Sequence, residues 1–217
     1  MEVLEFPELV VRTIRVGRMD NNVYLLTARQ DGSQLLIDAA AEPAAIQNLL
    51  ASAVGDGPSA ALAYVLTTHC HHDHIGALAT LAAAHPRAGH LAGDADADAI
   101  TAATGVPIAR RLVDGDLLPL GGAVLRVIGL RGHTPGSVTV AYEPGSGPAQ
   151  LFTGDSLFPG GVGRTRTDSD FRSLFGDVTE RIFARHSDDA VVWPGHGRPT
   201  TLGAERPSLQ EWSARGW

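Results

Sequence analysis

A ten-residue segment rich in histidine, residues 67–76, constrains this chain more than any other feature of its sequence. It reads Thr-Thr-His-Cys-His-His-Asp-His-Ile-Gly, follows an apolar run and precedes a segment rich in Ala and Leu, so we expect a strand–loop–helix junction. Residues two apart in an extended segment share one face, so His69 and His71 can bind one metal ion. Asp73 and His74, expected in the first helical turn, would face a neighbouring ion.

Three further metal-binding candidates lie far along the chain: His133, Asp155 and His196. Each comes just after an apolar run and beside glycine, and a glycine at a strand end lets a loop present a ligand closely. Taken alone, His133 could be a turn histidine and Asp155 a helix cap. Together with the histidine cluster they complete a set of five histidines and two aspartates, which points to a site for two metal ions.

Other polar residues near these positions allow more than one interpretation. Asp38 ends an apolar run, and it is either an acceptor for the second N–H group of a ligating histidine or a plain turn aspartate. Cys70 and His72 should point away from the metal ions if their segment is extended. Ordinary surface roles in helical or connecting regions are expected for three more histidines: His85, His90 and His186.

Apolar periodicity divides the chain into two similar halves of one domain, 1–217, roughly residues 1–115 and 116–217. Each half begins with short β-rich runs: Leu9–Val16, Val23–Thr27, Gln34–Ile37, Ala123–Leu130, Ser137–Tyr142 and Gln150–Phe152. Helical spacing follows at Ile46–Val54, Ala77–Ala84 and Phe171–Ile182, with Ser169 or Asp170 placed to cap the last helix. Two such halves predict two mixed sheets packed face to face with helices outside, a four-layer α/β arrangement.

Charge and composition exclude several classes of protein. The formal net charge is −7, so we expect no binding to nucleic acid or to an anionic membrane, and a small substrate instead. The amino terminus lacks the basic start and apolar run of a signal peptide, which predicts a cytoplasmic protein. A single cysteine excludes an intramolecular disulfide framework. The oligomeric state stays open.

The metal-binding pattern, His-x-His-x-Asp-His followed by separate His, Asp and His residues, resembles the metallo-β-lactamase superfamily over essentially the whole chain. The segments Asn22–Leu26 and Leu36–Asp38 also resemble its first strands. The resemblance implies a four-layer αββα sandwich and two metal ions. By the same resemblance, His69, His71 and His133 hold the first ion, Asp73, His74 and His196 hold the second, and Asp155 bridges both.

Two further segments, residues 154–165 and 194–197, resemble the glyoxalase II branch, which hydrolyses thioesters of small thiols. That likeness implies that Arg164 grips a substrate carboxylate, although a plain surface arginine fits the same position. Phe158 would pack against the acyl or thiol arm. The larger glyoxalase II enzymes continue into a helical domain that supplies basic groups for glutathione, whereas this chain has no Lys. The thiol therefore stays open between glutathione, coenzyme A and mycothiol.

The resemblance implies a hydrolase in which a hydroxide shared by two metal ions attacks the thioester, with Asp73 orienting it. A thiol has a pKa of about 8.5 and leaves as thiolate without a dedicated acid. Zn²⁺ suits these ligands, and Fe and Mn ions fit them too. The main alternative is an iron-dependent persulfide dioxygenase that uses only His69, His133 and Asp155. Lactone hydrolysis and a non-catalytic binding protein of this fold are further alternatives, whereas β-lactamases of the superfamily lack the bridging aspartate.

Overall fold

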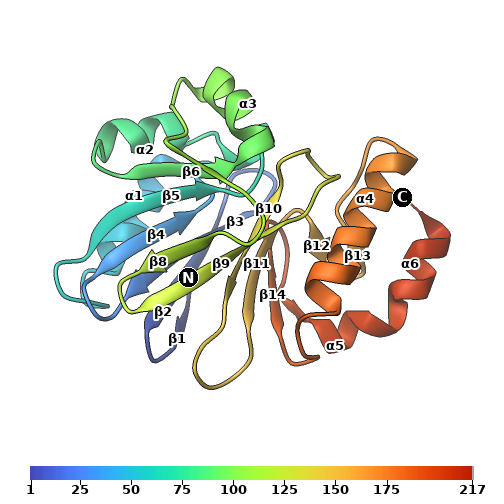
Figure 1. Cartoon of the computed structure of the whole chain (residues 1–217). Helices are drawn as coiled ribbons and strands as arrows, with labels where there is room; N and C mark the ends of the chain where they lie inside the picture. Colours follow the sequence, from blue (N-terminus) through green and yellow to red (C-terminus); the bar gives the residue numbers. More distant parts are fainter. Residues whose placement is uncertain (217) are drawn as a thin grey trace.

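Two large mixed β-sheets packed face to face, with helices on both outer faces, make up the protein (Figure 1). The computed structural model describes residues 1–216, so Trp217, the last residue of the expected domain, lies outside the described residues. The four-layer α/β arrangement predicted from the sequence is confirmed. No helix within residues 1–216 is long and apolar enough to cross a membrane.

The first sheet has the strand order β1-β2-β3-β4-β5-β6-β7. Its strands are β1 (Glu2–Glu5), β2 (Leu9–Val16), β3 (Asn21–Ala28), β4 (Ser33–Ile37), β5 (Ala61–Thr67), β6 (Gly89–Gly93) and β7 (Arg110–Leu112). The strands from β1 to β4 pair antiparallel and those from β4 to β7 parallel. Parallel neighbours require crossovers, which are supplied by α1 (Pro43–Ser52), α2 (Leu78–Ala84) and α3 (Asp94–Thr104). The loops after β4 and β5 therefore start at one edge of the sheet.

The second sheet has the order β15-β14-β11-β10-β9-β8. Its strands are β8 (Leu117–Leu120), β9 (Ala123–Gly129), β10 (Val138–Tyr142), β11 (Gln150–Gly154), β14 (Val191–Pro194) and β15 (Thr200–Thr201). Between β11 and β14, which are parallel, lie the hairpin β12 (Leu157–Phe158) and β13 (Gly161–Val162), then α4 (Asp168–Asp177) and a π-helical segment (Val178–Phe183). The helices α5 (Leu202–Glu205) and α6 (Leu209–Arg215) follow β15.

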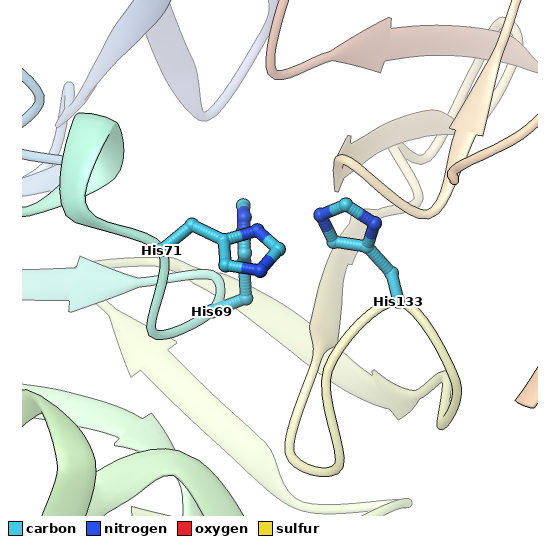
Figure 2. Close-up of side chains that lie close together, drawn as sticks. All are labelled: His69, His71 and His133. Carbon is cyan, nitrogen blue, oxygen red and sulfur yellow. The ribbon is translucent and has the colours of Figure 1, made fainter. Parts of the chain in front are cut away.

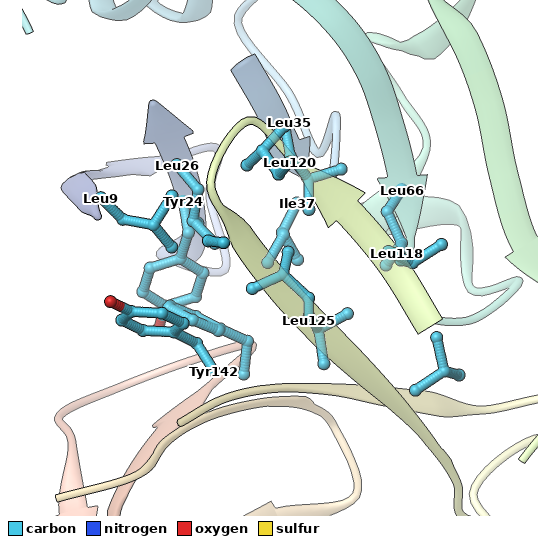
Figure 3. Packing of buried hydrophobic residues seen from close by; sticks show 14 of the residues in the cluster. Leu9, Tyr24, Leu26, Leu35, Ile37, Leu66, Leu118, Leu120, Leu125 and Tyr142 are labelled. Carbon is cyan, nitrogen blue, oxygen red and sulfur yellow. The ribbon is translucent and has the colours of Figure 1, made fainter. Parts of the chain in front are cut away.

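Alternation of side chains along the strands explains why both faces of the first sheet are covered. Leu35 and Ile37 of β4 point into the core between the sheets, where they join Leu125 of β9 (Figure 3). Leu36 points to the outer face, into the core cluster that includes Ile46 of α1. Full burial of such a side chain contributes about 1.5–3 kcal/mol, so a chain that is apolar on successive positions favours a strand buried on both faces.

Two local predictions are wrong. The helix α4 is capped by Thr167, whose Oγ1 accepts a hydrogen bond from Asp170 N at 3.1 Å, and not by Ser169 or Asp170. The helix starts two or three residues earlier than expected, and acidic residues, Asp168 included, favour its positively polarised first turn.

The histidine segment also differs from its expected form. Asp73 and His74 belong to a separate 3-10 turn, His72–His74, and α2 begins only at Leu78. Gly76 lies between them and packs against the backbone, since a Cβ there would lie 2.7 Å from Ala40 O. The turn is therefore held by the loop after β4 rather than by a continuing helix.

Candidate metal centre

All seven predicted ligands converge at one edge of the sandwich, and they come from both sheets. His69 and His71 follow β5, and His133 lies in the loop between β9 and β10. Asp155 and His196 follow the parallel strands β11 and β14, whose carboxyl ends meet at the same edge. Their ligand atoms form three overlapping groups, each within 4.8 Å: His69, His71 and His133; His69, His74 and Asp155; and Asp73, His74 and His196.

The first group consists of three imidazole rings that point toward one another (Figure 2). The ring centroids of His69 and His133 are 4.8 Å apart, and those of His71 and His133 are 4.5 Å apart. Burial lowers the pKa of all three rings, for His69 well below its ordinary value. The rings are therefore neutral at pH 7, as metal binding requires.

The hydrogen bonds of the rings aim their other nitrogens into the site. His133 Nδ1 donates to the carbonyl oxygen of Arg164 at 2.7 Å, and His196 Nδ1 donates to that of Met19 at 2.8 Å. His69 Nδ1 donates a hydrogen bond to Thr68 Oγ1 at 3.0 Å, because the Thr68 hydroxyl donates its own proton to Asp38. Because Nδ1 carries the proton in each of these rings, Nε2 is left with a lone pair facing the neighbouring ligands.

The group of Asp73, His74 and His196, called the second group from here on, is compact and more strongly charged. His196 Nε2 lies 3.2 Å from Asp73 Oδ2, and His74 Nε2 lies 3.2 Å from His196 Nε2. Burial would lower the pKa of His74, but the Asp38 and Asp155 carboxylates outweigh burial and raise that pKa to about 10. Burial would raise the pKa of Asp73, but a hydrogen bond from Asn21, the charge of His74 and a backbone hydrogen bond together outweigh burial and lower that pKa. This group therefore carries a carboxylate that stays ionised.

Asp155 lies between the two groups. Its Oδ1 is 3.4 Å from His74 Nε2, and its Oδ2 is 3.4 Å from His196 Nε2 and 3.7 Å from His133 Nε2. Burial would raise the pKa of Asp155, but its contacts with His196 and His74 outweigh burial and hold the pKa far below the usual range. A Cβ at the adjacent Gly195 would collide with Asp155 Oδ1, which explains the glycine before His196.

Asp38 connects the two histidine groups through hydrogen bonds. It is 2% exposed and has a left-handed backbone, with φ at +60°. Its Oδ2 accepts from His74 Nδ1 at 2.7 Å and from Thr68 Oγ1 at 2.8 Å, and its Oδ1 accepts from Thr68 N at 2.7 Å. Asp38 is thus the acceptor for the second N–H group of His74, and through Thr68 it orients His69.

Asn21, which no sequence argument nominated, reaches the second group. Its Nδ2 donates to Asp73 Oδ2 at 2.9 Å and lies 3.3 Å from His74 Nε2 and 3.4 Å from His196 Nε2. It begins β3, and it forms a β-bridge with His196. Its one signal in the sequence is its place directly before the segment Asn22–Leu26, whose pattern indicates a strand rather than part of the site.

Of the two residues expected to bind substrate, Arg164 lines a cavity beside the histidines and Phe158 does not. The Arg164 side chain lines a cavity of about 450 Å³ together with His71, His133, Thr165 and Arg166. Phe158 is half-buried in the hairpin formed by β12 and β13, and the residues that line this cavity do not include it.

The remaining histidines and the cysteine lie outside the three groups. His72 points away, with a side chain that is 91% exposed, while Cys70 is half-buried against the core beneath α2. His85 lies at the end of α2 and contacts a glutamine. Two surface assignments are wrong, because His90 lies in β6 with its Nδ1 buried and the His186 side chain is only 6% exposed.

The donor set fits a pair of divalent metal ions. Imidazole nitrogens and carboxylate oxygens suit Zn²⁺, Fe and Mn ions alike. The Nε2 atoms of His69 and His133 are buried and have no hydrogen-bond partner among residues 1–216. A buried polar atom left without a partner costs about 1–3 kcal/mol, and a bound cation would remove that cost.

Comparison with known proteins agrees with this geometry. The sequence profile of the metallo-beta-lactamase superfamily matches residues 16–196. The chain belongs to this superfamily. It is 31% identical over 198 residues to the hydroxyacylglutathione hydrolase of Polaromonas sp., a match that covers 87% of this chain and 66% of that enzyme. Hydroxyacylglutathione hydrolases at 31–35% identity support the glyoxalase II-like branch.

Two other known proteins are similar to the chain. The human mitochondrial persulfide dioxygenase ETHE1 is 31% identical over 174 residues, which are 80% of this chain and 62% of that protein. The crystal structure of TTHA1623 in a di-iron-bound form has a TM-score of 0.67 at 29% identity, covering 90% of this chain and 96% of the other. The matches thus cover 66% of the Polaromonas enzyme and 62% of human ETHE1.

Proposed function

We propose that this superfamily member is a dinuclear metal hydrolase that cleaves a thioester of a small thiol. The observation that carries the proposal is the position of the Asp155 carboxylate, with its oxygens 3.4–3.7 Å from histidine nitrogens of both groups. Seven ligands shared by two ions satisfy both coordination spheres, whereas one ion would leave several charged groups unused. The ligand roles proposed are those expected from the sequence.

A bound metal pair would supply two things, a water of lowered pKa and Lewis-acid polarisation of the substrate carbonyl. The chain supplies the orientation. Asp73, held by Asn21 and kept ionised, can accept a hydrogen bond from the attacking water and fix its direction. His69, His71 and His133 stay neutral. A thiolate leaving group has a pKa of about 8.5, so the site needs no further acid.

The thioester rests on the similarity to hydroxyacylglutathione hydrolases, since the geometry of the ligands alone suits many hydrolases. The Polaromonas enzyme is one of these, and the match covers 66% of it. A second candidate is persulfide dioxygenase activity, which the 31% identity to human ETHE1 favours. That activity would use iron at His69, His133 and Asp155. We favour hydrolysis because the Asp73, His74 and His196 group is complete and compact.

A metal analysis combined with a thioester panel tests the proposed function. We expect the purified protein to bind close to two Zn²⁺, Fe or Mn ions per chain and to hydrolyse at least one thioester among glutathione, coenzyme A and mycothiol adducts. Protein stripped with a chelator is the matched control and should regain activity with added metal. One iron per chain, together with O₂ consumed in proportion to a persulfide substrate, would instead establish the dioxygenase.

Replacement of Arg164 tests whether this residue binds a substrate carboxylate. If its guanidinium grips a carboxylate, Arg164→Ala should raise KM for a carboxylate-bearing thioester about 10-fold or more with little change in kcat. A grip made equally in ground and transition states changes KM alone. Arg164→Lys should restore only part of the loss, because Lys cannot form the planar two-point contact.

The control for this prediction is Arg87→Ala, which removes one positive charge at an exposed loop position far along the chain. Steady-state kinetics on thioesters with and without the carboxylate decides between the two interpretations of Arg164. Equal KM values for the wild type and both Arg164 variants on all substrates would show that Arg164 is a plain surface arginine.

A further inference from the structure

The three-histidine group depends on two loops from different sheets. One loop, after β5, carries His69 and His71, and the other, between β9 and β10, carries His133 (Figure 2). One backbone hydrogen bond joins the segments near the site, from Val138 N to Thr68 O at 2.9 Å. A single bond of this kind does not determine how the three rings face one another.

A buried carboxylate, Asp96, spans the same two loops. It lies in the first turn of α3 and is 1% exposed. Its Oδ2 accepts a hydrogen bond from Cys70 N at 2.9 Å and another from Thr134 Oγ1 at 2.6 Å. Its Oδ1 accepts from Gly136 N at 2.7 Å. Cys70 stands between His69 and His71 in the chain, and Thr134 directly follows His133.

The contact between α3 and the second loop is tight. A Cβ at Gly136 would collide with the backbone of Asp96, and a Cβ at Gly93 would collide with the Gly136 carbonyl oxygen. These two glycines therefore let the start of α3 rest directly on the loop that carries His133. The Thr134 hydroxyl lies a further 2.6 Å from Ser137 Oγ, which extends the network to the start of β10.

The partners of the Asp96 carboxylate are hydrogen-bond donors and not cations. No ion pair joins it to any cationic side chain among residues 1–216, so three hydrogen bonds and the positive end of α3 stabilise its charge. Removal of this carboxylate would leave donors in both loops without an acceptor. Its two oxygens bind donors from two loops at once.

We propose that Asp96 is a positioning residue that holds the loop of His69 and His71 against the loop of His133, and so sets the geometry of the three-histidine metal site. It touches none of the rings. The inference rests on the metal centre and not on the identity of the substrate. The Asp73, His74 and His196 group depends on other partners, namely Asn21, Asp38 and the Met19 carbonyl oxygen. Asp96 should therefore act on one metal position and leave the other intact.

Direct binding of Co²⁺ tests this proposal without any substrate. In the wild type we expect two equivalents of Co²⁺ to bind, as measured by equilibrium dialysis and by the visible absorption of the bound ion. In Asp96→Ala one equivalent should bind about 10- to 100-fold more weakly, as expected when a ligand loses its supporting contacts, and the other should bind normally. Asp96→Asn should lie between them, since its single oxygen can still accept from Cys70 and Thr134 but its NH₂ group cannot accept from Gly136.

The matched control is Asp56, a carboxylate with a 9% exposed side chain that accepts from Arg12 Nη2 at 2.7 Å, far from the site. Asp56→Ala should lower the melting temperature without changing Co²⁺ binding. The proposal is overturned if Asp96→Asn binds Co²⁺ with wild-type affinity and spectrum, or if both equivalents weaken together. If Asp96→Ala does not fold, the comparison of Asp96→Asn with Asp56→Asn still decides. A protein that cleaves no thioester but shows this selective loss would retain the proposal while rejecting the proposed hydrolase.

Discussion

Replacement of Asp155 by Ala should reduce the metal content from about two ions per chain to one or fewer and lower kcat by at least about 10²-fold, the loss typical for removal of a preorganised electrostatic group. The Asp155 carboxylate lies within 3.4–3.7 Å of His74, His133 and His196. Without it, two cations would face each other with no carboxylate between them. Elemental analysis and steady-state kinetics on the same preparation measure both effects.

An isosteric variant separates charge from shape at this position. Asp155→Asn keeps the side-chain volume beside Gly195 but removes the negative charge, so it should also lose metal, although its fold should be preserved. Asp189→Ala, at an exposed aspartate after the π-helical segment, should leave metal content and kcat unchanged. Two tightly bound ions and nearly full kcat in Asp155→Asn would show that no bridging carboxylate is required.

The second large effect is expected for Asp73→Asn. This change preserves the shape of the side chain but removes the negative charge of a carboxylate that the hydrogen bond from Asn21 helps to keep ionised. If Asp73 orients the attacking water, kcat should fall by about 10²–10⁴-fold, the range typical of a positioned acid or base. The melting temperature should change little, since Asp73 lies in a short turn at the edge of the core.

The control for Asp73 is Asp20→Asn, in the neighbouring loop. Asp20 is exposed and has a left-handed backbone with φ at +53°, which asparagine tolerates, so kcat should stay at the wild-type value. Wild-type kcat in Asp73→Asn would remove this residue from the reaction. Loss of the folded state would instead identify Asp73 as a residue whose main role is structural.

The strands nearest to the site were predictable because their information is local. β2 has the expected bounds Leu9–Val16, and the runs around β4 and β11 differ from the prediction by one or two residues. Alternating or continuous apolar residues specify a strand without reference to the rest of the chain. By contrast, β6 and α3 were not predicted, since Gly89–Gly93 contains two glycines and α3 begins Asp-Ala-Asp-Ala. Their conformations depend on packing against β5 and β7.

The sequence alone determined the chemical type of the site, because metal-binding side chains at short spacing in a strand–loop–helix junction have few other uses. It also nominated the distant residues His133, Asp155 and His196, which the fold brings to the same edge. The sequence could not determine which residues hold the metal-binding side chains in position. Asn21 meets Asp73 across 52 residues and Asp96 meets Thr134 across 38. The first contact forms when β3 and β5 join one sheet, and the second when the two sheets pack together. Only the tertiary structure therefore decides which carboxylates and amides hold the ligands in place.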